Sequence, residues 1–515
     1  MFSTNFSDID FAIVGVYLSG VIAIGFIANR FISSVSTYVV GGRRAGVALN
    51  TATYIGTAFG MNEIMYASIE GFRMGFAYLT MALISFSIPL LLGITGVVVK
   101  RLRELELTTL PEFFEHRFDR RARVTAGAVC VIAGSLNMGL FPKIGAIFVT
   151  YTLGLADQDT DPELTVNLIM TGLIVLVLAY TIMGGMVSVI ITDYVQFVVL
   201  SIGVGVALLH CLSHPDIGWS NMVDTWSRAR GEAAFNPFHP DSYGWVFIIW
   251  MLCMGVFGSV TWAPEATRSL TSKDASTTQM TFLLGSTGGF VRKAAPALIA
   301  IAAFAYFADH PTLSSHFFPD GLAGEVNNAP HALPLVLGKI LPAGLLGILV
   351  AGFLSAFLST HDSYILTWAS IFVRDVVDPL RGTSLSDRQQ IVLIRICVLC
   401  IGAFLLIWGV WYQLPDSVWT YLAVTGTVYI SGAGITVYGG IYWKRASSAG
   451  AFAALCGGLL AISALFIEAL QVHFPWLTEA KLAFSNFVLC ACLFVGFSLL
   501  FPDHKVKNAK EGSIG

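Results

Sequence analysis

The sequence has few charged residues, and this scarcity indicates the class of the protein. Only 12% of its 515 residues are Asp, Glu, Lys or Arg, whereas 56% are hydrophobic, and the mean hydropathy is +0.74. Soluble domains carry about twice that share of charged residues. The composition therefore predicts a chain that lies mostly in a lipid bilayer. The net charge of −3 is too small to indicate a nucleic-acid partner.

Other chemical signals are also missing. The eight cysteines lack the paired spacing of a zinc site, and the CxxC formed by Cys397 and Cys400 lies on an apolar run, where packed thiols are typical. Residues 1–10 lack the basic region and cleavage site of a signal peptide, so we expect residues 10–28 to remain as a spanning helix. Because no nucleophile, metal or phosphate-binding motif stands out, we expect no enzymatic activity.

Long apolar runs are what the sequence does contain. A helix needs roughly 20 apolar residues to cross the hydrocarbon of a bilayer, and such runs recur along the whole chain. We therefore predict an all-α integral membrane protein with about thirteen transmembrane helices. The expected spans are 10–28, 47–72, 76–99, 124–154, 164–183, 187–211, 243–262, 281–307, 333–373, 391–412, 416–441, 447–468 and 482–501.

The basic residues predict the orientation. Alternating the loops places most of them on one side, including the cluster from Lys100 to Arg123 and the tail from Lys505 to Lys510. Basic residues are retained on the cytoplasmic side during insertion. We therefore expect an inner (plasma) membrane protein with its N-terminus outside and its C-terminus in the cytoplasm.

Two spans carry polar and glycine-rich interruptions. The second contains Gly56, Gly60, Asn62 and Glu63, and the seventh contains the stretch from Gly255 to Ser259. Transporters hold ions where a helix unwinds and frees its backbone carbonyls. Glycine is also common in membrane helices for packing alone. The pattern favours unwinding in the second span and leaves both interpretations open for the seventh.

The ninth span carries the densest polar cluster within an apolar segment. Ala356, Ser359, Thr360 and Ser363 recur at helical spacing and share one face. Hard cations prefer oxygen ligands, so the hydroxyls on this face and carbonyls from an unwound partner can form a sodium site. The hydroxyls can equally bond the preceding turn of their own helix.

The chain resembles the sodium/solute symporter family along nearly its whole length. The resemblance is carried by the order and spacing of several short stretches. They are Tyr38-Val-Val-Gly-Gly-Arg43, Leu107-Thr-Thr-Leu-Pro-Glu-Phe113, the segment from Gly184 to Gln196, Ala356-Phe-Leu-Ser-Thr360 with Asp362-Ser363, Arg374-Asp375 and Tyr442-Trp-Lys-Arg445.

The resemblance implies a fold and a set of segments. A LeuT-type core of two inverted five-helix repeats is expected, with one helix before it and two after it. The implied segments are an N-terminal tail, first helix and loop (1–46), the first repeat (47–212), an external loop (213–242), the second repeat (243–446) and two C-terminal helices with a tail (447–515).

The resemblance also implies Na⁺ as the coupling ion. Its ligands would be the backbone carbonyls of Ala58, Met61 and Ala356 and the hydroxyls of Ser359 and Thr360. Some members hold a second sodium, and Asp193, Asp362 and Ser363 stand where that site would be. The alternative is that Asp193 only caps or pairs near the cytoplasmic end of its helix.

By the same analogy, a small solute would bind between the two interrupted helices. The implied residues are Phe59, Asn62, Glu63, Asn137, Lys143, Phe257, Gly258, Ser259, Tyr421 and Thr425. Gly60 stands where proline-transporting members carry an aspartate, which disfavours proline. Glu63 and His361 are ionisable groups near the ion site, where a binding role and a structural role both remain open. Lys143, and also Arg292 and Lys293, can neutralise an anionic solute or extend toward an interface.

We therefore predict sodium-coupled secondary active symport of a small organic solute, with a slight preference for a carboxylate-bearing metabolite or an amino acid. The expected partners are the solute and the lipid bilayer, with no nucleic acid and no obligatory protein. A transporter-like sensor without flux and a proton-coupled symporter remain as alternatives.

Overall fold

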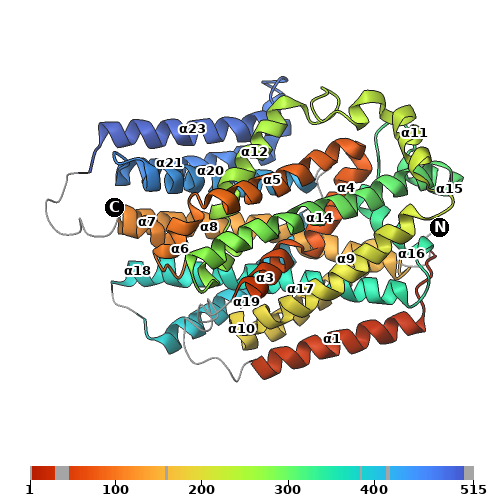
Figure 1. Ribbon diagram of the computed structural model, residues 1–515, viewed down its shortest axis with the longest axis horizontal. Coiled ribbons are helices and arrows are strands. Elements are labelled where there is room, and N and C mark those ends of the chain that lie inside the picture. Colours follow the sequence, from red (N-terminus) through yellow and green to blue (C-terminus); the bar gives the residue numbers. More distant parts are fainter. Residues whose placement is uncertain (1–2, 29–45, 157–160, 383–384, 413–417, 504–515) are drawn as a thin grey trace.

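The computed structural model describes residues 3–28, 46–156, 161–382, 385–412 and 418–503. Side chains at 22, 24–28, 57–58, 180, 183–197, 267–269 and 271 lie outside this description. All regular elements within it are helices, most of which run along one common direction (Figure 1). The predicted all-α class is therefore confirmed.

The first half of the chain contains one peripheral helix and the first set of core helices. Their bounds are α1 (Asp8–Ala28), α3 (Val47–Ala58), α4 (Met61–Met74), η3 (Gly75–Tyr78), α5 (Leu79–Thr95), α6 (Val99–Glu104), α7 (Pro111–Arg117), α8 (Arg120–Asn137), η4 (Met138–Leu140), α9 (Phe141–Thr152) and α10 (Pro162–Leu212).

The second half begins after a loop that contains a short helix. The elements are α11 (Trp219–Arg230), η5 (Gly231–Ala234), α12 (Gly244–Thr261), α13 (Ala263–Thr271), α14 (Ala275–Ala308), α15 (Pro311–Phe317), η6 (Ala329–His331), α16 (Ala332–Ile340), α17 (Leu345–Ile371), the π-helix η7 (Phe372–Val377), α18 (Asp378–Arg381), α19 (Asp387–Trp411), α20 (Val418–Tyr442), α21 (Ser448–Gly458), η8 (Leu459–Phe466), α22 (Ile467–Gln471) and α23 (Glu479–Leu500).

The number of spans differs from the prediction. In the described part of the chain, ten helical segments are long and apolar enough to cross a bilayer. The expected spans 164–183 and 187–211 belong to one continuous helix, α10. The expected count of thirteen is therefore not reproduced, although each predicted apolar run overlaps a helix.

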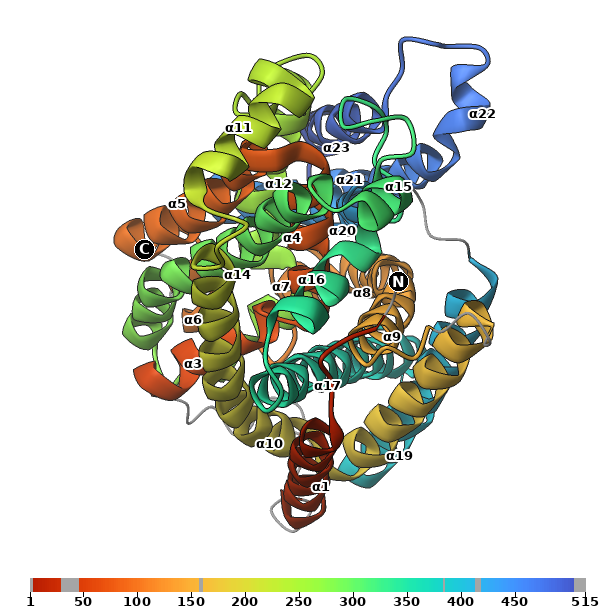
Figure 2. The ribbon, with the colours of Figure 1, turned by 90° about the vertical axis from the view of Figure 1, so that its right-hand side faces the viewer.

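The ribbon shows where the first and last helices end and which helices lie on the outside of the bundle. Helix α1 begins and α23 ends at opposite ends of the bundle (Figure 1). Viewed along the bundle, α1 and α19 lie on the periphery, whereas α4 and α8 are surrounded by other helices (Figure 2).

Asp10 of α1 accepts hydrogen bonds from the backbone N–H groups of Gly344 (2.7 Å) and Gly347 (2.6 Å), so the extra first helix stabilises the start of α17.

The predicted interruption of the second span is confirmed. Helix α3 ends at Ala58 and α4 begins at Met61, with Phe59 and Gly60 in non-helical conformations between them (ψ 54° and 163°). At such a break the last carbonyls of a helix lose the partners of a continuous helix, although here the Ile55 carbonyl accepts from Phe59 N (2.7 Å) and the Gly60 carbonyl from Ile64 N (3.2 Å). An ion can therefore be coordinated there.

Of the two interpretations left open for the seventh span, packing is the one found at Gly255–Ser259. Helix α12 runs without a break through Gly255, Gly258 and Ser259, and Ser259 Oγ donates to the Gly255 carbonyl (2.6 Å). A Cβ atom at Gly255 would lie 2.4 Å from Ile88 Cδ1, so this glycine allows close helix packing rather than unwinding. The break occurs at Trp262, which is extended (ψ 109°).

Helix α14 packs very closely against the first interrupted helix and against α5. Cβ atoms at Gly285 and Gly288 would lie 2.6 Å from Tyr54 and Ile55 of α3, and one at Gly289 would lie 2.4 Å from the Ser85 carbonyl of α5. Glycine is needed at these positions because any side chain would separate the helices. The next turn of α14 therefore faces the break between α3 and α4.

Candidate functional site

A cavity of about 230 Å³ lies between the two interrupted helices. It is bounded by α3, α4, α5, α8, α9, α12, α13, α14, α17 and α20, and ligand sites are often built between the helices of a bundle in this way. Its wall combines aromatic rings with a few ionisable and amide groups. The polar and aromatic lining residues are Tyr54, Asn62, Glu63, Tyr66, Ser85, Asn137, Phe141, Ser259, Trp262, Glu265, Arg292, Lys293, Thr360, Tyr364 and Trp419.

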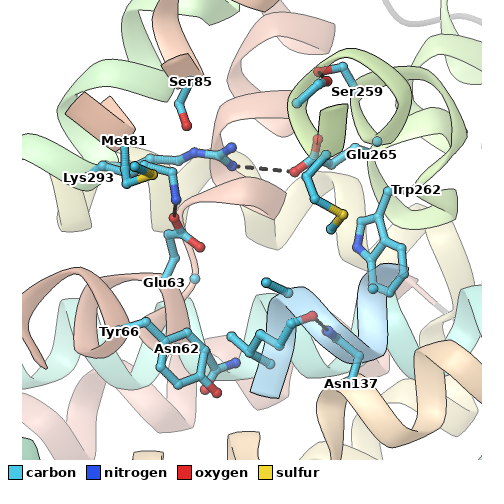
Figure 3. Close-up of a pocket in the computed structure, with 18 of the residues that line it drawn as sticks. Asn62, Glu63, Tyr66, Met81, Ser85, Asn137, Ser259, Trp262, Glu265 and Lys293 are labelled. Carbon is cyan, nitrogen blue, oxygen red and sulfur yellow. Dashed lines mark hydrogen bonds and ion pairs between the residues drawn. The ribbon is translucent and has the colours of Figure 1, made fainter. Parts of the chain in front are cut away.

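Two ion pairs cross this cavity wall, and both use α14. The Lys293 ammonium contacts the Glu63 carboxylate of α4, and Arg292 Nη1 lies 3.4 Å from Glu265 Oε1 of α13. Figure 3 shows Glu63 and Lys293 pointing toward each other, with Glu265 beside Trp262 and Ser259 across the cavity. All four side chains are mostly buried.

The two acids occupy equivalent positions on their helices. Glu63 lies in the first turn of α4, after the break at Gly60, and Glu265 lies in the first turn of α13, after the break at Trp262. A carboxylate in a first turn is stabilised by the helix dipole. Arg292 and Lys293, which are neighbours on α14, therefore bind α13 and α4 directly after the two breaks.

Asn62 carries unused hydrogen-bonding capacity into the cavity. Its side chain is 2% exposed, and neither amide atom has a hydrogen-bond partner among the described residues. The Tyr66 hydroxyl, one turn further along α4, is likewise buried without one in this part of the structure. Buried polar groups are nearly always bonded, so these two side chains are suited to hydrogen bond a bound solute.

Among the residues expected to bind sodium, Thr360 lies against the break of the first core helix. A Cβ atom at Gly60 would lie 1.9 Å from Thr360 Oγ1, so the α17 hydroxyl lies directly against the unwound backbone. Met61, Ala356, Ser359 and Thr360 are all buried. Thr360 Oγ1 donates to the Ala356 carbonyl (3.0 Å), which leaves its lone pairs available to a cation. Ala58 is the last residue of α3, and its side chain lies outside the description.

The expected second sodium site is described only in part. Asp362 and Ser363 are buried on α17, one turn beyond the Ser359–Thr360 pair. Asp193 lies in α10, but its side chain belongs to the residues that the structure does not describe.

The expected solute residues divide into two groups. Asn62, Glu63, Asn137, Gly258 and Ser259 line the cavity. The residues that do not line it are Phe59, Lys143, Phe257, Tyr421 and Thr425.

Contacts away from the cavity explain this division. The Lys143 ammonium donates to the backbone carbonyl of Tyr412 (3.4 Å), and Phe257 stacks on Phe487 (5.7 Å between centroids). Thr425 Oγ1 accepts a hydrogen bond from the amide of Asn137 (2.9 Å), so it holds a lining residue from behind.

Glu265 was missed because only the stretch from Gly255 to Ser259 was considered for unwinding in the seventh span. The signal was present in Trp262-Ala-Pro-Glu265, since proline favours the first turn of a helix and an acid near it favours a helix start. The ring of Trp419, with its centroid 4.1 Å from the Lys293 ammonium, was also missed. Its proximity to Lys293 could not be read from the sequence.

The helices have the LeuT-type fold. In overall fold the chain is similar to a solved substrate-bound, outward-open Na⁺-coupled sialic acid symporter, with a TM-score of 0.76 at 18% identity over 96% of this chain and 98% of that one. The sequence profile of the sodium:solute symporter family matches residues 38–458, and the chain belongs to this family.

Curated relatives agree with the family. The chain is 24% identical over 477 residues to the sodium/sialic acid symporter SiaT of Proteus mirabilis, covering 89% of this chain and 90% of the relative. It is 25% identical over 441 residues to the human high affinity choline transporter 1, covering 78% and 70% respectively. The protein is thus a sodium-coupled membrane symporter of a small solute, as predicted, and not an enzyme.

Proposed function

We propose that Na⁺ binds at the break between α3 and α4 and drives uptake of a small carboxylate-bearing solute held in the adjacent cavity. The observation that carries this proposal is the contact between Gly60 and Thr360, which brings a hydroxyl of α17 against the unwound backbone. The ligands would be the carbonyls of Ala58, Met61 and Ala356 and the hydroxyls of Ser359 and Thr360. A second sodium at Asp193, Asp362 and Ser363 belongs to the same proposal.

The solute would lie between the two breaks. Asn62, Glu63, Asn137 and Ser259 line the cavity at this level, together with the cations of α14. Lys293 supports the preference for a carboxylate, because charged groups within a membrane protein usually face a partner or a pathway. Phe59, Lys143, Phe257, Tyr421 and Thr425 would act only indirectly in this arrangement.

The ion gradient is large enough for concentrative uptake. One Na⁺ moving down about 100 mV contributes about 2.3 kcal/mol, and a tenfold gradient contributes about 1.4 kcal/mol more. Together these support accumulation of several hundredfold. Sodium bound at the break would order α3 and α4 against α17 and favour the state that accepts solute from outside.

The membrane orientation and the division into repeats complete the proposal. We place the N-terminus outside and the C-terminus in the cytoplasm of the plasma membrane, on the distribution of basic residues. The two five-helix repeats would be residues 47–212 and 243–446, flanked by 1–46, 213–242 and 447–515.

The test is a sodium titration of the protein in proteoliposomes, followed by tryptophan fluorescence and compared with potassium and with acidification. Thr360→Ala should remove the sodium-specific change, because it deletes a proposed ligand. Thr171→Ala is the matched control, since its exposed hydroxyl also bonds the preceding turn (2.8 Å to the Asn167 carbonyl) on α10. A response to protons alone, or a normal response in Thr360→Ala, would overturn the ligand set.

A further inference from the structure

The cavity wall carries both signs of charge in equal number. Among its described lining residues, the ionisable acids and bases are Glu63, Glu265, Arg292 and Lys293. Each acid is paired with one of the two cations of α14. The wall is therefore electrically neutral and strongly dipolar.

This pairing limits which solutes can bind between the charged groups. A solute with only a carboxylate could bind Lys293, but it would leave Glu63 buried beside it without its cation. A solute with only a cation could bind Glu63, but it would leave Lys293 buried beside it without its acid. Removing one partner of a buried pair is strongly unfavourable because an uncompensated charge remains. A solute that carries both charges keeps every buried charge paired.

We propose that the solute is a small zwitterion, such as an α-amino acid or an N-methylated amino acid, that opens the Glu63–Lys293 pair and binds between its two members. Its carboxylate takes the Lys293 ammonium and its cationic nitrogen takes the Glu63 carboxylate. Asn62 and Tyr66, whose polar atoms are buried without partners in the described structure, hydrogen bond the solute. This inference rests on the proposed position of the solute in the same cavity.

The geometry of the pair restricts the charge separation of the solute. Glu63 and Lys293 are in direct contact, so only a short spacer fits between the ends of a molecule that inserts there. The cavity, at about 230 Å³, is smaller than the roughly 300–1,000 Å³ typical of sites for drug-sized ligands. Both features favour a compact zwitterion over an extended one.

The second ion pair has a different role. Arg292 and Glu265 hold α13 to α14 directly after the break at Trp262, and they stay together when the solute binds. We assign them as positioning residues. The aromatic rings of Phe141, Trp262 and Trp419 cover the remaining wall and suit an apolar or methylated part of the solute.

The test is a binding screen by thermal shift in Na⁺, using sets of molecules with the same shape and different charge. The probes are the twenty common amino acids and glycine betaine, each compared with its carboxylate-only and cation-only analogues. For betaine these are 3,3-dimethylbutyrate and choline, and for leucine they are 4-methylpentanoate and isopentylamine. Glucose and glycerol serve as neutral probes.

We expect at least one zwitterion to bind and its singly charged analogues to bind at least about 100-fold more weakly, because a site with fixed polar groups rejects a ligand that lacks a partner. The proposal is overturned if the only ligands are single anions, single cations or neutral sugars. It is also overturned if neither betaine nor any amino acid binds.

Charge-removing variants test the assigned contacts. Glu63→Gln should shift the preference toward the carboxylate-only analogue, because Lys293 then lacks its acid. Lys293→Gln should shift it the opposite way, toward the cation-only analogue. A purely structural ion pair would weaken all ligands together in both variants, and that result would contradict the proposal. Arg228→Gln, on the outer helix α11 and outside the cavity, is the matched control.

The sodium titration separates this inference from the proposed function. If the Na⁺-specific fluorescence change persists while no zwitterion binds, only the solute class is wrong. If the fluorescence change is absent or follows protons alone, the sodium site itself is wrong. The change should persist in Arg228→Gln, outside the cavity, and a cooperative thermal unfolding transition shows whether Glu63→Gln is folded.

Discussion

Arg123 Nε donates to Asp375 Oδ1 over 2.7 Å, and this bond joins the start of α8 to the π-helix at the end of α17. Asp375 is fully buried and also accepts a hydrogen bond from the Thr109 hydroxyl (2.8 Å). Arg123 reaches Glu115 of α7 as well (2.6 Å). One guanidinium therefore connects three segments at the end of the bundle where α17 terminates.

Loss of this guanidinium should destabilise the fold. Arg123→Gln leaves Asp375 buried without its main counter-charge, and we expect a loss of about 3–5 kcal/mol. Thermal unfolding in detergent would measure it as a lower Tm. The double variant Arg123→Gln/Asp375→Asn should recover part of the loss, because the stranded charge is removed. If the stability losses of the two single variants simply add in the double variant, a direct interaction between Arg123 and Asp375 is contradicted.

Gly60 should not tolerate a side chain. In Gly60→Ala the new Cβ would overlap Thr360 Oγ1, at 1.9 Å, so either the Thr360 side chain must rotate or α4 and α17 must separate, and both changes disturb the proposed ligand set. We expect the sodium affinity, measured by fluorescence titration, to fall by at least about tenfold, equivalent to about 1.4 kcal/mol. Gly172→Ala on α10, where a Cβ would meet nothing within 4 Å, should bind sodium normally. Equal behaviour of the two variants would contradict the close contact.

The face of α14 formed by Gly285, Gly288 and Gly289 should likewise not tolerate side chains, although it is not part of the proposed sodium site. A Cβ at Gly289 would lie 2.4 Å from the Ser85 carbonyl, a backbone atom that cannot rotate away. Gly289→Ala should therefore lower stability by about 1–3 kcal/mol. The control is Gly205→Ala, which has open space around the added methyl group. A Tm for Gly289→Ala as high as that of the control would show that α5 and α14 can move apart freely.

The segment before α16 should loosen in acid. Burial, with a smaller effect of the neighbouring His316, lowers the pKa of His331 to about 3, and the His331 ring stacks on Tyr151 of α9 (3.9 Å). The folded state therefore keeps His331 neutral, whereas an unfolded histidine takes up a proton near pH 6.5. The contribution of the neutral His331 ring to the free energy of unfolding is complete above pH 6.5 and is lost progressively as the pH falls toward 3.

Between pH 7.5 and pH 5.5 we expect a loss of about 1.4 kcal/mol from this group. Hydrogen exchange of the stretch from Pro311 to Leu341 should accelerate over that interval. His331→Gln should reduce this pH dependence to the part contributed by the neighbouring His316, whose pKa burial also lowers, while His473→Gln, at an exposed position after α22, should leave it intact. Unchanged acceleration in His331→Gln would assign the effect to another group.

The helices could be predicted from the sequence because the bilayer imposes their length. The break at Gly60 could be predicted too, since glycines and polar residues coincide there in an apolar run. The break at Trp262 was not identified, because Gly255 and Gly258 carry the same local signal while serving close packing. Glycine content alone does not separate these two uses, whereas Pro264 and Glu265 mark the start of a helix directly.

The site could be predicted less completely, because its main contacts link residues that are far apart in the chain. Glu63 was identified as an unusual acid, but its partner lies 230 positions later, and one sequence contains no information on that pairing. Lys143 was an equally plausible cation, and only the three-dimensional structure shows it bonded to the Tyr412 carbonyl. Thr360 was found because its position relative to Ala356 follows from helical spacing alone.

The distance in sequence between Glu63 and Lys293 has a consequence for biosynthesis. At about 5–20 residues per second, the ribosome needs roughly 10–50 s to add the 230 residues that separate them. During that interval the first helices enter the membrane while the acid beside their break has no counter-charge. The nascent first half must therefore keep Glu63 near water or protonated until α14 arrives, and a chain released before α14 would expose this acid to the quality-control machinery of the membrane.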